Sequence, residues 1–131
     1  MDLTKTQHLD LLFYMRLTRA IEDRLEALLK QGKIVGGLFR SMGQEATAVG
    51  SAYALDKNHG DIVSPLTRDL GAMLVMGALP REVFSQYLAR ASAPSHGRDQ
   101  NLHFTDLERG FIGTISPLGT LIAVMNGVVL G

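Results

Sequence analysis

The chain has 131 residues, of which 46% are hydrophobic, so it has enough apolar material for the packed core of one domain or of part of a larger one. Its 13 basic and 13 acidic side chains balance, which argues against nucleic acid or an anionic membrane as a partner. The absence of cysteine excludes disulfides, thiolate catalysis and cysteine-ligated metals.

An amphipathic helix is predicted over residues 6–31, because apolar residues recur there every three to four positions and Gly32 follows as a stop. The apolar stripe consists of Leu9, Leu12, Phe13, Leu17, Ile21, Leu25, Leu28 and Leu29. The charged residues on the other face, Glu22 and Asp23 among them, are interpreted as a solvated surface. Because Glu22 and Asp23 point in different directions around the helix, we do not interpret them as a catalytic pair.

The next segments predict an alternation of helix and strand. Ser41 and Gln44 have the spacing of a capping box at the start of a short helix that ends near Asp56. A turn at residues 58–60 then leads to 61–64, which has the pattern of a short buried strand. This order indicates an α/β layer.

Thr67 and Arg68 follow the predicted strand directly. In parallel sheets, ligands bind just beyond the carboxyl ends of the strands, so these two residues are candidates for binding. The alternative is that Arg68 pairs with a nearby carboxylate, either Asp69 or Asp61. The residues themselves leave both interpretations open.

A further helix is predicted to begin at Pro80, and the long polar loop 91–108 follows it. Loops of this length inside a compact domain tend to be functional. His103 in this loop is a candidate proton donor or acceptor, the alternative being a histidine bonded to loop backbone. The histidines of the chain show none of the spacings of zinc ligands, so we expect no metal site built from them.

The segment 111–131 carries no formal charge. Ser116 and Pro117 have the pattern of a helix N-cap and first helical residue, where free N–H groups favour a polar or anionic ligand. The following small residues permit a close helix crossing and are Gly119, Ala123, Gly127 and Gly131. The segment has the length of a membrane span, but its polar residues favour a helix buried inside a protein, and no membrane partner is expected.

Several stretches, taken in order, resemble one family over residues 9–131. They are Gly37-Leu38-Phe39-Arg40-Ser41-Met42-Gly43-Gln44-Glu45-Ala46, Arg68-Asp69-Leu70-Gly71, Gly97-Arg98-Asp99-Gln100-Asn101-Leu102-His103 and Ile115-Ser116-Pro117-Leu118. The family is the alpha chain of the thiamin-diphosphate-dependent first component of 2-oxo acid dehydrogenase complexes, of pyruvate or branched-chain type. The resemblance implies a single partial domain over residues 1–131, with the helix at 6–31 and the first part of a thiamin-diphosphate-binding α/β domain, a parallel sheet flanked by helices, at 32–131.

The resemblance also implies an activity and an assembly. The activity is oxidative decarboxylation of a 2-oxo acid with acyl transfer to a lipoyl group, with thiamin diphosphate and Mg²⁺ as cofactors. The implied partners are a beta chain and a second alpha chain, forming a heterotetramer, and a lipoyl-bearing acyltransferase. No secretory or transit signal is visible, so we expect a cytoplasmic location, or the mitochondrial matrix if the source is eukaryotic.

Site residues follow by position from the same resemblance. Arg68 would contact the diphosphate, Thr67 stands where the family usually has tyrosine, and Ser116 and Leu118 would contact the cofactor. His103 would assist near the substrate as a catalytic residue.

Two further positions bear on the ligands. Phe39 replaces a residue that is often polar in pyruvate-type chains, which favours a larger apolar substrate. Branched-chain members can hold a potassium ion with a threonine at the place of Thr120 and a glutamine at the place of Leu121. Because Leu121 cannot ligate an ion, no potassium site is expected.

The family places a Gly-Asp-Gly motif, whose aspartate binds Mg²⁺, just beyond the position of Gly131. We therefore expect an amino-terminal fragment that contains no metal ligand and is inactive alone. The alternative is a non-catalytic helical interaction or oligomerisation module derived from the same fold, in which the exposed small-residue helix drives self-association.

Overall fold

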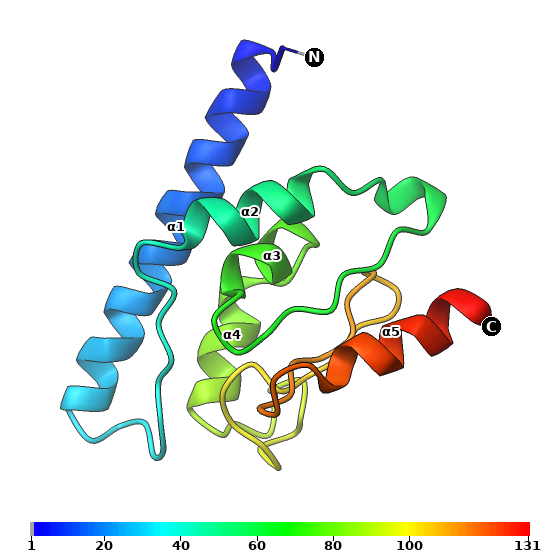
Figure 1. Cartoon of the computed structure of the whole chain (residues 1–131). Helices are drawn as coiled ribbons and strands as arrows, with labels where there is room; N and C mark the ends of the chain where they lie inside the picture. Colours follow the sequence, from blue (N-terminus) through cyan, green and yellow to red (C-terminus); the bar gives the residue numbers. More distant parts are fainter. Residues whose placement is uncertain (1) are drawn as a thin grey trace.

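The computed structural model describes residues 2–131, and Met1, which the predicted domain includes, lies outside them. The helices in chain order are α1 (Lys5–Lys30), α2 (Glu45–Tyr53), the 3₁₀ helix η1 (Lys57–His59), α3 (Leu70–Val75), α4 (Pro80–Tyr87) and α5 (Thr120–Leu130). Figure 1 shows α1 as a long rod along one side, with α2 and α3 against its middle and α5 apart on the other side.

The helix predicted for residues 6–31 forms as α1, displaced by one residue at each end. Thr4 caps it by accepting a hydrogen bond from the backbone N–H of Gln7, while the Gln7 side chain accepts one from the backbone N–H of Thr4. Gly32, with a φ of 68°, ends the helix in the left-handed region that glycine adopts without strain.

The carboxyl-terminal half of α1 is the more deeply buried part, while Leu11, Tyr14 and Met15 of its first half pack against the core formed by α2 and α3. In the carboxyl-terminal half, Ile21, Leu25 and Leu28 join one cluster with buried residues of α3, α4 and the loops, among them Met73 and Phe111. The first turns of α1 extend beyond the rest of the chain (Figure 1). Within the predicted apolar stripe, Leu9, Leu12 and Phe13 are about half exposed.

The helices α2 and α3 form a second small core from alanine and valine side chains. Their close approach depends on Gly71, since a Cβ atom there would lie 2.8 Å from Cγ2 of Val49 and 3.2 Å from Oγ1 of Thr18. This contact fixes the start of α3, and with it the turn that precedes the helix.

The expected parallel sheet does not form among residues 2–131. The backbone pairing amounts to isolated bridges of Phe111, parallel with Val63 and antiparallel with Asp106. The parallel bridge uses Val63 N–H to Gly110 O at 2.9 Å and Ile112 N–H to Val63 O at 3.0 Å. It does not continue towards residue 65, because Pro65 has no N–H to donate to the next carbonyl of the ladder.

Two helix starts also differ from the prediction. The N-cap of α2 is Gln44, without a side-chain cap, while Ser41 is buried and donates to Glu22 instead. The N-cap of α5 is Gly119, so Ser116 and Pro117 lie in the loop before the helix. At the start of α2, the Ser41 hydroxyl therefore bonds to a buried carboxylate and does not cap the helix.

The helix α5 is not buried on all sides as predicted. Leu121 is its buried residue, and most of its other side chains are exposed. A Cβ atom added at Gly127 would have no atom within 4 Å, so the row of small residues meets no other helix in this part of the chain. No helix within residues 2–131 combines the length and the apolar character that a bilayer crossing requires.

Candidate functional site

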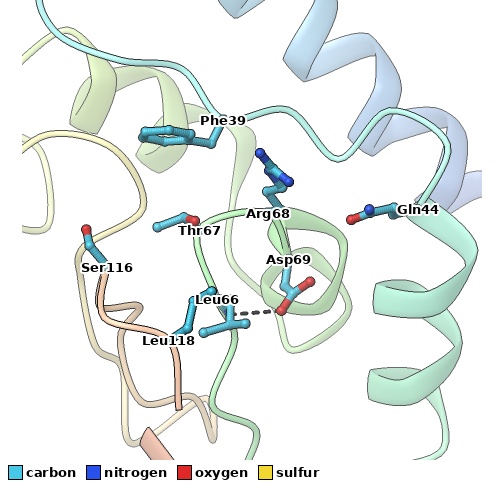
Figure 2. Close-up of a pocket in the computed structure, with 8 residues that line it drawn as sticks. All are labelled: Phe39, Gln44, Leu66, Thr67, Arg68, Asp69, Ser116 and Leu118. Carbon is cyan, nitrogen blue, oxygen red and sulfur yellow. Dashed lines mark hydrogen bonds between the residues drawn. The ribbon is translucent and has the colours of Figure 1, made fainter. Parts of the chain in front are cut away.

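A cavity of about 410 Å³ lies where three distant parts of the chain meet (Figure 2). Its lining residues are Phe39, Gln44, Leu66, Thr67, Arg68, Asp69, Ser116 and Leu118. They come from the segment before α2, the turn before α3 and the loop before α5. The structure thus brings together four predicted cofactor contacts, Thr67, Arg68, Ser116 and Leu118. The volume is typical of small-molecule sites.

A closed turn presents Thr67 and Arg68 to this cavity. The backbone N–H of Asp69 donates to Leu66 O at 2.9 Å, and the Asp69 carboxylate accepts from the backbone N–H of Leu66 at 2.9 Å. The two bonds pin both ends of the turn, so the two side chains between them project away from the backbone (Figure 2).

Arg68 has no ion-pair partner among residues 2–131. The Asp69 carboxylate is bound to Leu66, and that of Asp61 accepts from the backbone N–H of Asp56 at 2.8 Å. The alternative in which Arg68 pairs with Asp69 or Asp61 is therefore not observed. The cavity holds a solvated guanidinium that is available to an anionic group.

The opposite wall of the cavity is Ser116 and Leu118, both exposed. The backbone before them is firmly held, because Phe111 is fully buried and Gly113 donates to Thr105 Oγ1 at 2.7 Å. The free N–H groups predicted at a helix start do not lie at Ser116, since α5 begins only at Thr120. The wall therefore offers a hydroxyl and an apolar side chain.

His103 does not line the cavity of Arg68. It lines a neighbouring cavity of about 430 Å³, which shares Ser116 with the first. Its Nδ1 donates to the Asp99 carboxylate at 3.3 Å, and its Nε2 is buried without a hydrogen-bond partner in the described chain. The predicted catalytic residue is thus near the Arg68 cavity but separate from it, and bonds to a side chain rather than to loop backbone.

Sequence reasoning misses three lining residues. The spacing of Gln44 from Ser41 indicates a capping box rather than a binding site. Leu66 and Asp69 belong to no binding motif, and only their position next to Thr67 and Arg68 could have indicated that they line the cavity. The described residues contain no group of three or more histidine, aspartate or glutamate side chains arranged to hold a metal ion. The cavity therefore has a cationic and hydroxyl-bearing lining without a cluster of acids.

Comparison with known proteins gives consistent matches. The chain is 33% identical to the 2-oxoisovalerate dehydrogenase subunit alpha of Bacillus subtilis (strain 168), over 99% of this chain and 39% of that protein. It is 32% identical to the pyruvate dehydrogenase E1 component subunit alpha of Zymomonas mobilis, over 88% of this chain and 33% of that protein. It is 31% identical to the mitochondrial pyruvate dehydrogenase E1 component subunit alpha-1 of Arabidopsis thaliana, over 92% and 30%.

The chain thus spans between about a third and two fifths of the length of these relatives. The profile of the family described as "Dehydrogenase E1 component" matches residues 14–131, which include every lining residue of the Arg68 cavity. The chain therefore belongs to the dehydrogenase E1 component family.

Proposed function

We propose that this chain is a portion of the alpha subunit of a 2-oxo acid dehydrogenase, and that its Arg68 cavity holds the diphosphate end of thiamin diphosphate. The observation that carries the proposal is the meeting of Arg68, Ser116 and Leu118 around one cavity. The family match and the alpha-subunit relatives support it. The activity belongs to the complete enzyme, and the isolated chain is inactive under this proposal.

The residues present fit such a ligand. A planar guanidinium binds two phosphate oxygens at once, and Arg68 has no competing carboxylate in the described structure. The hydroxyls of Thr67 and Ser116 can donate to further oxygens, and Leu118 offers an apolar surface to an organic ring. The fit is therefore chemical as well as positional.

Thiamin diphosphate, when bound, would supply the electron sink for decarboxylation of a 2-oxo acid. This chain would contribute binding and orientation, with Arg68 offsetting phosphate charge. Mg²⁺ would accompany the diphosphate, with protein ligands supplied by the complete enzyme. Phe39 on the cavity wall favours an apolar substrate, such as a branched-chain 2-oxo acid.

The remaining parts of the proposal concern the assembly. A beta chain and a second alpha chain complete the cofactor site, and a lipoyl-bearing acyltransferase receives the acyl group. His103, in the neighbouring cavity, assists a proton transfer close to the substrate.

Titration of inorganic pyrophosphate and of thiamin diphosphate into the ¹⁵N-labelled chain, followed by NMR, tests the diphosphate site. We expect weak, saturable shifts of the Thr67, Arg68 and Ser116 amides. Arg68→Ala should weaken binding about 10- to 150-fold, the effect of losing a charge-assisted hydrogen bond of about 1.5–3 kcal/mol. Arg68→Lys should have an intermediate effect, because lysine keeps the charge but lacks the planar guanidinium that donates two parallel hydrogen bonds.

Arg90→Ala is the matched control, since Arg90 is exposed, does not line the cavity and has no ion-pair partner within residues 2–131. It should bind as the parent chain does. Shifts that map to another surface, an absence of shifts in the parent chain, or equal affinity in Arg68→Ala would each contradict the proposal.

A further inference from the structure

The segment 36–44, which we call the strap, runs from the loop after α1 back along that helix to the start of α2 (Figure 1). It contributes Phe39 and Gln44 to the cavity, and Figure 2 shows both on the strap facing the Arg68 turn. Neither side chain has a hydrogen bond within the described residues. Their positions therefore depend on what holds the strap backbone.

A single buried carboxylate holds the centre of the strap. Glu22 of α1 is 2% exposed, and both of its oxygens accept from the backbone N–H of Ser41, at 2.9 and 3.0 Å. Its Oε1 also accepts from the Ser41 hydroxyl at 2.7 Å. Ser41 is itself 1% exposed, so all three bonds are shielded from water. Ser41 lies two residues after Phe39 and three before Gln44.

The residues on either side of Ser41 in the strap are also held by carboxylates. Arg40 forms ion pairs with Asp23 and Glu26 of α1. The Glu45 carboxylate accepts from the backbone N–H of Gly43 at 2.9 Å and pairs with Arg19. Glu22 and Glu45 are the buried carboxylates among these contacts, at 2% and 7% exposed, and Glu22 is the one that binds the centre of the strap.

Burial of Glu22 is costly for folding. Desolvation raises the pKa of Glu22, against the hydrogen bonds of Ser41 and the charge of Arg40, which lower it, while the charge of Glu45 adds to the rise. The phenol of Tyr87, from α4, also lies within range of its charge. A raised pKa means that ionisation of Glu22 disfavours the folded state as the pH rises through its folded pKa. The hydrogen bonds to the strap thus offset only part of the cost of burying the ionised side chain.

We propose that Glu22 is a positioning residue, which fixes the strap through Ser41 so that Phe39 and Gln44 stand over Arg68 as one wall of the cavity. The positioning itself stands on the contacts of Glu22, and only its effect on ligand affinity rests on the proposed function. Charged residues inside a protein often serve to specify one arrangement rather than to increase stability.

The chain contains no tryptophan, so Phe39→Trp introduces a single fluorescent reporter on the strap. In this background, Glu22→Ala should shift the emission to longer wavelength and raise the acrylamide quenching constant, because the strap leaves its position. Ser41→Ala, which removes one of three hydrogen bonds, should produce a smaller change in the same direction. Glu22→Gln keeps one acceptor oxygen and should restore part of the parent signal.

Glu108→Gln is the control, because Glu108 is exposed and its side chain takes no part in the contacts of the strap. It should leave emission and quenching at the parent values. Far-UV circular dichroism confirms that each variant is folded before its fluorescence is compared. If Glu22→Ala does not fold, the comparison rests on Ser41→Ala and Glu22→Gln.

The outcomes separate this proposal from the proposed function. Unchanged emission and quenching in the folded variants would overturn the positioning role, whatever the ligand does. A changed signal together with weaker pyrophosphate binding supports both proposals. A changed signal in a chain whose parent does not bind pyrophosphate supports the positioning role and overturns the diphosphate site.

Discussion

Arg109 and Glu82 form a two-pronged ion pair, with Nη1 to Oε2 at 2.7 Å and Nη2 to Oε1 at 3.0 Å. The same guanidinium donates from Nε to the Asp106 carboxylate at 2.6 Å and from Nη1 to Gly77 O at 2.8 Å. Its Cζ lies 5.6 Å from the centre of the Phe111 ring. One side chain therefore joins the end of α3, the start of α4 and the loop that leads to Ser116.

Arg109→Ala should lower the free energy of unfolding by about 2 kcal/mol at neutral pH, because several charge-assisted hydrogen bonds are lost together. The variant should also change the pH dependence of stability. The hydrogen bonds of Arg109 lower the pKa of Glu82, and, against the opposing effect of burial, that of Asp106. Carboxylates with a lowered folded pKa stabilise the protein above their unfolded pKa, and this stabilisation is lost as the pH falls.

Urea unfolding of both chains at a series of pH values checks this prediction. The parent chain should lose stability as the pH falls below about 4, and Arg109→Ala should lose less over the same range. Arg90→Ala, an exposed arginine outside these contacts, should follow the parent curve. Parallel curves for the parent and Arg109→Ala would refute the assignment.

Gly113→Ala should destabilise the chain by about 1–3 kcal/mol, the usual range for overpacking. A Cβ atom there would lie 2.6 Å from the carbonyl oxygen of Phe104 and 2.7 Å from Oγ1 of Thr105, and a backbone carbonyl cannot move aside cheaply. In contrast, Gly50→Ala should stabilise by about 0.5–1 kcal/mol, because Gly50 lies inside α2 with open space around its Cβ position. Thermal unfolding of the pair gives the comparison, and equal melting temperatures would show that neither environment is as described.

The chain should self-associate through α5. Ile122 and Val129 on this helix are 69% and 82% exposed, and the helix carries no charge that would keep two copies apart. Sedimentation velocity should show oligomers that grow with concentration, and Ile122→Lys with Val129→Lys should shift them towards the monomer. Leu107→Lys, at a side chain 66% exposed on a loop, is the matched control and should change little. A parent chain that sediments as a monomer at all concentrations would contradict the prediction.

The sequence predicts four of the eight residues that line the cavity as cofactor contacts, although not the elements that carry them. Thr67, Arg68, Ser116 and Leu118 are placed by their resemblance to successive family motifs, and they line one cavity. The periodicity of α1 predicts its extent, because helical spacing is a local property. Whether these residues hold a cofactor is a matter for the titrations described above.

The wrong predictions share one physical cause. A local sequence pattern does not show which residues, far apart in the chain, become neighbours in the fold. The spacing to Gln44 predicts that the Ser41 hydroxyl accepts from the first turn of a helix, but in the fold it donates to the carboxylate of Glu22, 19 residues earlier in the chain. The charges of α1 are predicted to face solvent, and Glu22 is buried because the strap covers it. The segment 61–64 has the composition of a strand, yet its β-bridging within residues 2–131 is limited to the isolated pair of Val63 with Phe111.

The junction between the cavity wall and α5 consists of a single residue. Gly119, with a φ of 83°, separates Leu118 from the first residue of the helix. The helix α5 thus begins two residues after Leu118, so a displacement of its first turn also displaces the backbone next to the cavity wall. If a partner that docks on α5 and a ligand in the cavity favour the same position of Leu118, linkage requires that the binding of each strengthens the binding of the other.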